Sequence, residues 1–262
     1  MTGGEQGNRV APGGDPWADL REFTVARIAL GHAGNALPTA RLLEFQRDHA
    51  LARDAVHVAF DPSAVETALS GMRCITVRSK APDRKTYLQR PDLGRTLRAV
   101  DRGCLARGDY DIVFVICDGL SALAVHRWAA DLLRSLLPRL EGLSIAPVVL
   151  AHHGRVALGD AVALALGARM VVVLIGERPG LSSADSLGAY LTFAPRCDTR
   201  DAERNCVSNI RGEGLPTTAA AGEISFLVKE AFRLQLTGIE LKADRPDGLL
   251  ASGDLSCASR VT

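Results

Sequence analysis

The sequence predicts an α/β fold, in which a parallel-sheet domain follows a small N-terminal helical domain. Three apolar, β-branched runs at 112–117, 145–151 and 170–175 are typical of strands buried on both faces. Helix-like segments separate these runs, and this alternation favours a parallel, doubly wound sheet. A chain of 262 residues that is 47% hydrophobic can bury one substantial core beside a second, smaller unit.

The N-terminal part is expected to contain a lead-in and several helices. Residues 1–18 are rich in Gly and Pro and have no apolar core segment, so they predict a flexible lead-in and not a signal peptide. The stretch from Pro38 to about Val58 contains no interior Gly or Pro and predicts one long helix. His49 falls on its apolar face, where a packed histidine is a better interpretation than a catalytic one.

The end of this unit, which is assigned to residues 19–95, is more polar. A short helix is expected at 63–69 and a strand at 72–77, before a polar segment at 79–95 with two prolines and a glycine. Two interpretations of that segment remain open: a solvated linker, or a basic surface that contacts a partner or ligand.

The sheet domain is assigned to residues 96–262. Besides the three strands, helices are expected at 120–137, 160–166 and 223–235. Residues 180–211 show no clear periodicity, and a loop of that length inside a domain is usually functional or disordered. Its aliphatic and aromatic side chains argue against disorder.

Composition excludes several classes of protein. The 31 basic and 30 acidic residues leave a net charge of +1, which gives no electrostatic reason to expect nucleic acid or an anionic membrane as partner. No run of about 18 apolar residues is present, so no membrane span is expected. The six cysteines are scattered without metal-ligand spacing, which favours free thiols.

Polar and glycine residues follow each of the three predicted strands. Since the carboxyl ends of parallel strands meet at one edge of a sheet, a ligand site is expected there, where glycines let the backbone approach a ligand closely. The residues concerned are Asp118, Gly119, Ser121, His152, His153, Gly154, Arg155, Val156, Gly176, Glu177 and Arg178.

The motifs of common enzyme classes are missing. No G-x-G-x-x-G follows a strand, and neither G-x-x-x-x-G-K-[ST] nor G-x-S-x-G occurs. A free-standing enzyme acting on a small molecule through Asp118, His152 or His153, and Glu177 remains an alternative, as does a scaffold protein. The histidine pair is interpreted as an ordinary strand-end pair before it is interpreted as a metal site.

Several long blocks in order resemble one family. From about Asp19 to Lys242 the chain is similar to the small, or light, subunit of adenosylcobalamin-dependent ethanolamine ammonia-lyase. The blocks are ARIALGHAGNALPTARLLEFQRDHALARDAVH from Ala26, YLQRPDLGR from Tyr87, DGLSA from Asp118, GRVALGD from Gly154, LIGERPGLSSADSLGAYLTFAPR from Leu174, DAERNCVSNIR from Asp201 and TGIELK from Thr237.

This resemblance implies a lyase that converts ethanolamine to acetaldehyde and ammonia by a radical mechanism, started by homolysis of the cofactor's Co–C bond. The large subunit, a TIM barrel, is expected to bind ethanolamine and to carry the catalytic residues. The small subunit is expected to join it in a hetero-oligomer, with a helical part and a Rossmann-like part, and to be inactive alone. The cobalamin contacts carried over from the family are Val156, Glu177 and Cys206, and Arg155 beside Val156 is a natural further contact.

Two further expectations follow from the resemblance. None of the histidines stands in a D-x-H-x-x-G motif, so the cofactor is expected to keep its own dimethylbenzimidazole base on cobalt. The lead-in lacks an amphipathic pattern, so a bacterial microcompartment and the cytoplasm both remain possible locations.

Overall fold

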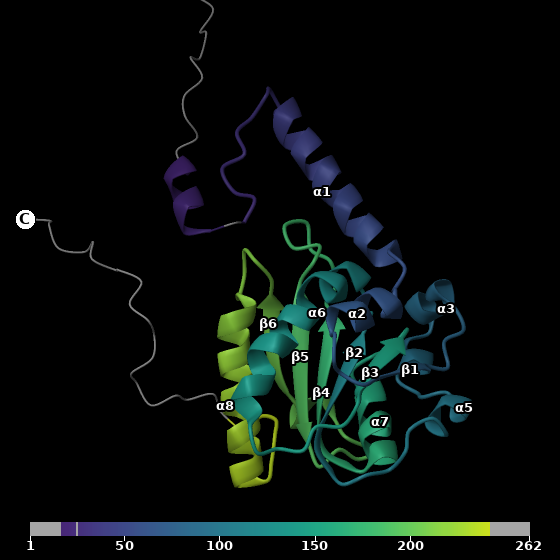
Figure 1. The fold of residues 1–262 in the computed structure, drawn as a ribbon. Helices are drawn as coiled ribbons and strands as arrows, with labels where there is room; N and C mark the ends of the chain where they lie inside the picture. Colours follow the sequence, from purple (N-terminus) through teal and green to yellow (C-terminus); the bar gives the residue numbers. More distant parts are fainter. Residues whose placement is uncertain (1–16, 25, 242–262) are drawn as a thin grey trace, which may run out of the picture.

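The computed structural model describes residues 17–24 and 26–241 (Figure 1). The helices are α1 Thr39–His57, α2 Pro62–Ala68, α3 Arg84–Gln89, α4 Pro91–Gly94, α5 Ala99–Arg102, α6 Ala122–Leu136, α7 Leu158–Leu166 and α8 Thr217–Leu234, with short 3-10 turns at Ala18–Phe23, Leu137–Leu140 and Asp201–Glu203. The strands are β1 Cys74–Arg78, β2 Tyr110–Cys117, β3 Val148–His152, β4 Ala168–Gly176, β5 Leu187–Phe193 and β6 Asn205–Ile210.

These strands form one mixed sheet in the order β1-β3-β2-β4-β5-β6. The first four strands in that order are parallel, whereas β5 is antiparallel to both β4 and β6. The three strands predicted from apolar runs are β2, β3 and β4. The predicted α/β class and the predominantly parallel sheet are therefore confirmed.

Both faces of the sheet are covered by helices, as Figure 1 shows. Phe114 and Ile116 of β2 belong to the core formed with α6 and α8 on one face. Val115 and Cys117, which point the other way, belong to the core formed with α7. Because β2 is apolar on both faces, its sequence is a continuous hydrophobic run and not an alternating one.

The long loop expected at 180–211 is wrong, because this segment contains β5 and β6. β6 lies at the edge of the sheet, where only Val207 and Ile210 among its six residues are buried. Its other positions are exposed or half-buried and carry polar residues or cysteine. The apolar signal of this strand is therefore too short to be recognised in the sequence.

Of the two interpretations of 79–95, the solvated linker is wrong. This segment forms α3 and α4, and its one aromatic side chain, Tyr87, has no exposed surface. Directly before it, β1 pairs with β3 in the sheet. The range 19–95 thus contributes a strand to the sheet as well as helices, and the division into units at 95/96 stays a prediction.

Helix α1 stands away from the sheet (Figure 1). It is the long helix predicted from Pro38 to Val58, but only Ala55 in it is buried. The expectation of a packed His49 is wrong: this side chain is exposed and stacks on Phe45, with ring centroids 6.1 Å apart. The apolar face of α1 therefore remains open to solvent in this chain.

Candidate functional site

The ends of β2 and β4 touch through two glycines. The backbone N–H of Leu120 donates to the carbonyl of Gly176 at 2.9 Å. Gly119 has a φ of +55°, and a Cβ atom placed on it would lie 2.3 Å from that same carbonyl oxygen. A Cβ atom on Gly176 would lie 1.9 Å from the carbonyl oxygen of Ser121. Only glycine permits this approach, which brings the strand-end segments together.

Asp118, the residue after β2, is buried beneath the turn that follows β3. One carboxylate oxygen accepts a hydrogen bond from the Gly154 N–H at 3.2 Å, and the other lies 3.5 Å from Nη1 of Arg84. Burial raises the pKa of Asp118 to about 7, although Arg84 and nearby backbone N–H groups act in the opposite direction. Asp118 therefore holds the turn that presents Arg155 and Val156.

Arg84 links this turn to the end of α1. Its Nη1 donates to the Gly119 carbonyl at 2.7 Å, and its Nε donates to the Val56 carbonyl at 2.8 Å. A segment expected to be a linker thus supplies a cation to the strand ends.

A cavity of about 470 Å³ extends from the turn after β3 to the middle of β5 and the start of β6. It contains three of the four predicted contact residues, Arg155, Val156 and Cys206, which come from the turn after β3 and from β6. The other lining residues are Pro91, Arg95, Ala157, Tyr190, Asp201 and Arg204. The sequence interpretation located Cys206 in a loop, whereas the structure places it on a strand opposite Tyr190 of β5.

The thiol of Cys206 is neutral at physiological pH. Desolvation raises its pKa above the ordinary value of 9.0, and the neighbouring Tyr190 hydroxyl offsets part of that rise. A thiol with a raised pKa is a weak nucleophile. Cys206 therefore presents a small, uncharged, weakly polar group to the cavity and not a thiolate.

Glu177 lies outside the lining of this cavity. Its Oε1 accepts from the Ser208 hydroxyl at 2.5 Å, and its Oε2 accepts from the Ser186 hydroxyl at 2.5 Å. The Asn209 N–H donates to Oε2 at 3.3 Å. The carboxylate thus joins the end of β4 to β6. Ser208 and Cys206 are two residues apart on β6 and share one face of the sheet, so Glu177 lies on the same face as Cys206 but outside its cavity.

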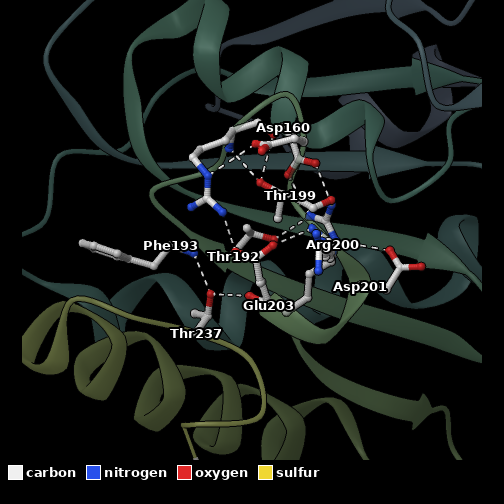
Figure 2. A network of polar contacts seen from close by, with 11 residues as sticks. Asp160, Thr192, Phe193, Thr199, Arg200, Asp201, Glu203 and Thr237 are labelled. Atoms are coloured by element: carbon white, nitrogen blue, oxygen red, sulfur yellow. Dashed lines mark hydrogen bonds and ion pairs between the residues drawn. The ribbon is translucent and has the colours of Figure 1, made fainter.

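A buried ion pair fixes β6 against α7. Arg204, one residue before β6, donates from Nη1 and Nη2 to the two carboxylate oxygens of Asp160, both at 2.7 Å. Its Nη1 also donates to the Thr192 hydroxyl at 2.8 Å. Figure 2 shows Asp160, Thr192 and Thr199 converging on this point. The pair brings the wall that carries Cys206 close to the wall that carries Val156.

Comparison with known proteins decides the family. The family model described as ethanolamine ammonia-lyase light chain matches residues 14–242. The chain belongs to the ethanolamine ammonia-lyase light-chain family. It is 56% identical to an ethanolamine ammonia-lyase small subunit of Xanthomonas campestris over 249 residues, covering 90% of this chain and 92% of that one. A small subunit of Azotobacter vinelandii is 54% identical, with 87% and 88% covered, and one of Ralstonia nicotianae is 52% identical, with 91% and 92% covered.

In this light chain the histidine pair at the end of β3 is packed against aromatic side chains. His152 meets the edge of Phe60, with ring centroids 5.2 Å apart, and burial lowers its pKa to about 4. His153 stacks on Tyr87 at 5.8 Å, and its Nδ1 lies 3.3 Å from the Ala81 carbonyl. Within residues 17–24 and 26–241, no three His, Cys, Asp or Glu side chains form a group that could hold a metal ion.

Three residues of the light-chain site were missed in the sequence. Asp160 and Arg204 lie in separate blocks, and no local pattern pairs two charges that meet only after β6 has docked on α7. Tyr87 was read as part of a polar surface because its neighbours are polar. The available signal was that Tyr87 is the one aromatic residue in that polar segment, because a buried aromatic anchor commonly interrupts such a stretch.

Proposed function

We propose that this chain forms one wall of the adenosylcobalamin site of an ethanolamine ammonia-lyase complex, which converts ethanolamine to acetaldehyde and ammonia by a radical mechanism. The large subunit would form the opposite wall, bind ethanolamine and carry the catalytic residues. The observation that supports this proposal is that the adjacent residues Arg155 and Val156 and the distant residue Cys206 line one cavity.

The chemistry of the lining suits a corrinoid. Val156 offers an apolar contact for the edge of a corrin ring, and Cys206 offers a neutral thiol. Arg155 offers hydrogen-bond donors, and its buried Nε has no hydrogen-bond partner among the described residues. A cobalamin is much larger than a cavity of 470 Å³. Most of the cofactor would therefore lie against another chain, as the proposal requires.

Glu177 retains capacity for one more hydrogen bond. A carboxylate oxygen has two acceptor sites, and Oε1 of Glu177 uses one of them for Ser208. The free site would accept a hydrogen bond from a side-chain amide on the rim of the cofactor. Ser186 and Ser208 would then keep the carboxylate oriented toward that amide.

When bound, adenosylcobalamin supplies the radical chemistry, and the protein binds and orients it. The residues of this chain would position the cofactor and exclude water from its side of the site. Since His152 and His153 are packed against Phe60 and Tyr87, we expect the cofactor to keep its own dimethylbenzimidazole base.

The exposed face of α1 is the proposed contact with the large subunit. Leu43 and Leu51 on this helix are 58% and 55% exposed, and Leu42 and Phe45 are 43% and 42% exposed. Because a helix has about 3.6 residues per turn, Leu42 and Phe45 lie on one side of α1 and Leu43 and Leu51 on another. Apolar surface exposed on two sides of one helix marks an interaction surface. The relatives of this chain are named small subunits, which favours a larger companion chain as the occupant.

The function is tested by reconstitution. The purified chain with ethanolamine and adenosylcobalamin is expected to form no acetaldehyde, and addition of the large subunit is expected to produce it. A Val156→Asp variant should assemble with the large subunit but show a raised KM for the coenzyme, because it places a charge against an apolar ring. Robust activity of the chain alone, or an unchanged KM in the variant complex, would contradict the proposal.

The cellular location is proposed to be a bacterial microcompartment or the cytoplasm. No helix in the described part of the chain is long and apolar enough to cross a membrane. Co-sedimentation of the complex with purified shells would select the microcompartment, and its recovery in the shell-free fraction would select the cytoplasm.

A further inference from the structure

Tyr87 contacts two guanidinium groups beneath the proposed cofactor site. Its ring centroid is 4.3 Å from Cζ of Arg155 and 5.1 Å from Cζ of Arg84. Its hydroxyl donates to the Gly154 carbonyl at 3.0 Å, and its side chain has no exposed surface. One aromatic ring thus contacts both the backbone and the cation of the turn that follows β3.

Arg155 receives its orientation from this ring. Among the described residues, its buried Nε has no hydrogen-bond partner, so no hydrogen bond at that nitrogen directs it. A planar guanidinium stacks on an aromatic face in a defined orientation, which an ammonium group does not reproduce. The ring of Tyr87 therefore limits where the donor groups of Arg155 can point, at the wall of the cavity that Arg155 lines.

Gly94 of α4 packs against both Tyr87 and Arg155. Its carbonyl accepts a hydrogen bond from the Arg155 N–H at 2.9 Å. A Cβ atom at Gly94 would lie 2.8 Å from Cε2 of Tyr87 and 2.9 Å from Cγ of Arg155. The absence of a side chain at Gly94 is thus what lets α4 pack directly over the stacked pair.

We propose that Tyr87 is a positioning residue for the cofactor site: its ring, and its hydroxyl through the Gly154 carbonyl, together orient the Arg155 guanidinium toward the bound corrinoid. This inference rests on the proposed function. According to this inference, α3 and α4 determine the orientation of Arg155, although Pro91 is their only residue in the lining of the cavity.

The test measures the binding of cyanocobalamin, an inert corrinoid, to the complex reconstituted with the large subunit. Tyr87→Leu and Arg155→Met are each expected to weaken binding by about five- to thirtyfold, the range from an exposed to a desolvated cation–π contact. If Tyr87 acts through Arg155, the double variant should bind no more weakly than Arg155→Met alone. Additive losses in the double variant would overturn the inference.

Two further variants keep the test decisive if Tyr87→Leu does not fold. Arg155→Lys keeps the charge but loses the planar group, so its affinity should stay close to that of Arg155→Met. Gly94→Ala keeps both side chains and forces them apart, so it should weaken binding in the wild-type background and not in Arg155→Met. Wild-type affinity in Arg155→Lys, or in a folded Gly94→Ala complex, would overturn the inference.

Val156→Asp separates this inference from the function on which it rests. If Val156→Asp weakens cyanocobalamin binding and the Tyr87, Gly94 and Arg155→Lys variants do not, only the positioning role of Tyr87 fails. If Val156→Asp binds cyanocobalamin like the wild type, the site itself is elsewhere, and both proposals fail.

Discussion

The guanidinium of Arg204 and the carboxylate of Asp160 form a two-point ion pair in the interior of the protein, with only 2% and 6% of their side chains exposed. The pair connects the segment that begins β6 to helix α7. This connection sets the distance between two walls of the candidate cavity. One wall carries Cys206 and the other carries Val156.

Removal of one partner should be costly. We expect Arg204→Met to lower the free energy of unfolding by about 3–5 kcal/mol, because the Asp160 carboxylate would stay buried without its cation. Urea denaturation measures this loss. Arg90→Met is the matched control, since Arg90 pairs with Asp92 at 2.7 Å on the surface and should change stability little. Equal effects of the two substitutions would contradict the assignment of Arg204 as a structural clamp.

Asp118 should make stability fall as pH rises. Its pKa in the folded protein is about 7 and its ordinary value is 3.8, so between these values the folded state binds more protons than the unfolded state. The contribution of Asp118 to the free energy of unfolding should therefore decrease toward neutral pH, by at most about 1.4 kcal/mol per pH unit. The stability that protonated Asp118 contributes is fully present below about pH 4 and is lost as the pH rises through about 7.

Asp118→Asn isolates this contribution. The variant should lose less stability than the wild type between about pH 5 and pH 7.5, measured by urea denaturation at each pH. His152, whose pKa is lowered to about 4, acts with the opposite sign because protonation on acidification opposes folding. This effect is common to both proteins and cancels in the comparison. Parallel pH profiles would show that Asp118 titrates at its ordinary value in the folded state.

Cys206 should be protected by the cofactor. Its raised pKa predicts slow alkylation by iodoacetamide at neutral pH and a rate that increases up to and beyond pH 9. In the reconstituted complex, cyanocobalamin should reduce this alkylation further, as measured by mass spectrometry. The exposed Cys104 lies outside the cavity lining and serves as the control. Equal protection of both cysteines, or of neither, would argue against a corrinoid beside Cys206.

Leu43 and Leu51 should matter for assembly and not for folding. Because both are exposed on α1, glutamate at either position should leave the melting temperature of the isolated chain nearly unchanged. The same substitutions should prevent association with the large subunit in size-exclusion chromatography. Val100→Glu on α5 is the control, since Val100 is 69% exposed and away from α1. Normal assembly of both α1 variants would place the contact elsewhere.

The sequence predicted best the parts of the fold that are buried on both sides. β2, β3 and β4 are continuous apolar runs, which admit few other interpretations. The edge strand β6 and the short helices α3 and α4 were missed because their burial comes from contacts with distant segments. The polar segment 79–95 packs against the sheet because the side chain of Tyr87 is buried beneath the turn at Gly154.

The site was predicted in the same uneven way. The family resemblance predicts Val156 and Cys206, with Arg155 as the neighbour of Val156, and the structure brings these three to one cavity. Glu177 was chosen in the same way, but its carboxylate is held by Ser186 and Ser208 outside that cavity. Hydrogen bonds between distant side chains, such as these, have no signature in sequence spacing.

The turn after β3 is held at both of its central backbone groups. Asp118 accepts the Gly154 N–H, and Tyr87 donates to the Gly154 carbonyl. Because the two successive peptide units that flank Gly154 are both hydrogen-bonded, the turn has lost much of its conformational entropy before any ligand arrives, so binding at this turn incurs little further ordering cost. Amide hydrogen exchange at Gly154 should consequently be slow in the chain alone and should change little when a corrinoid is added.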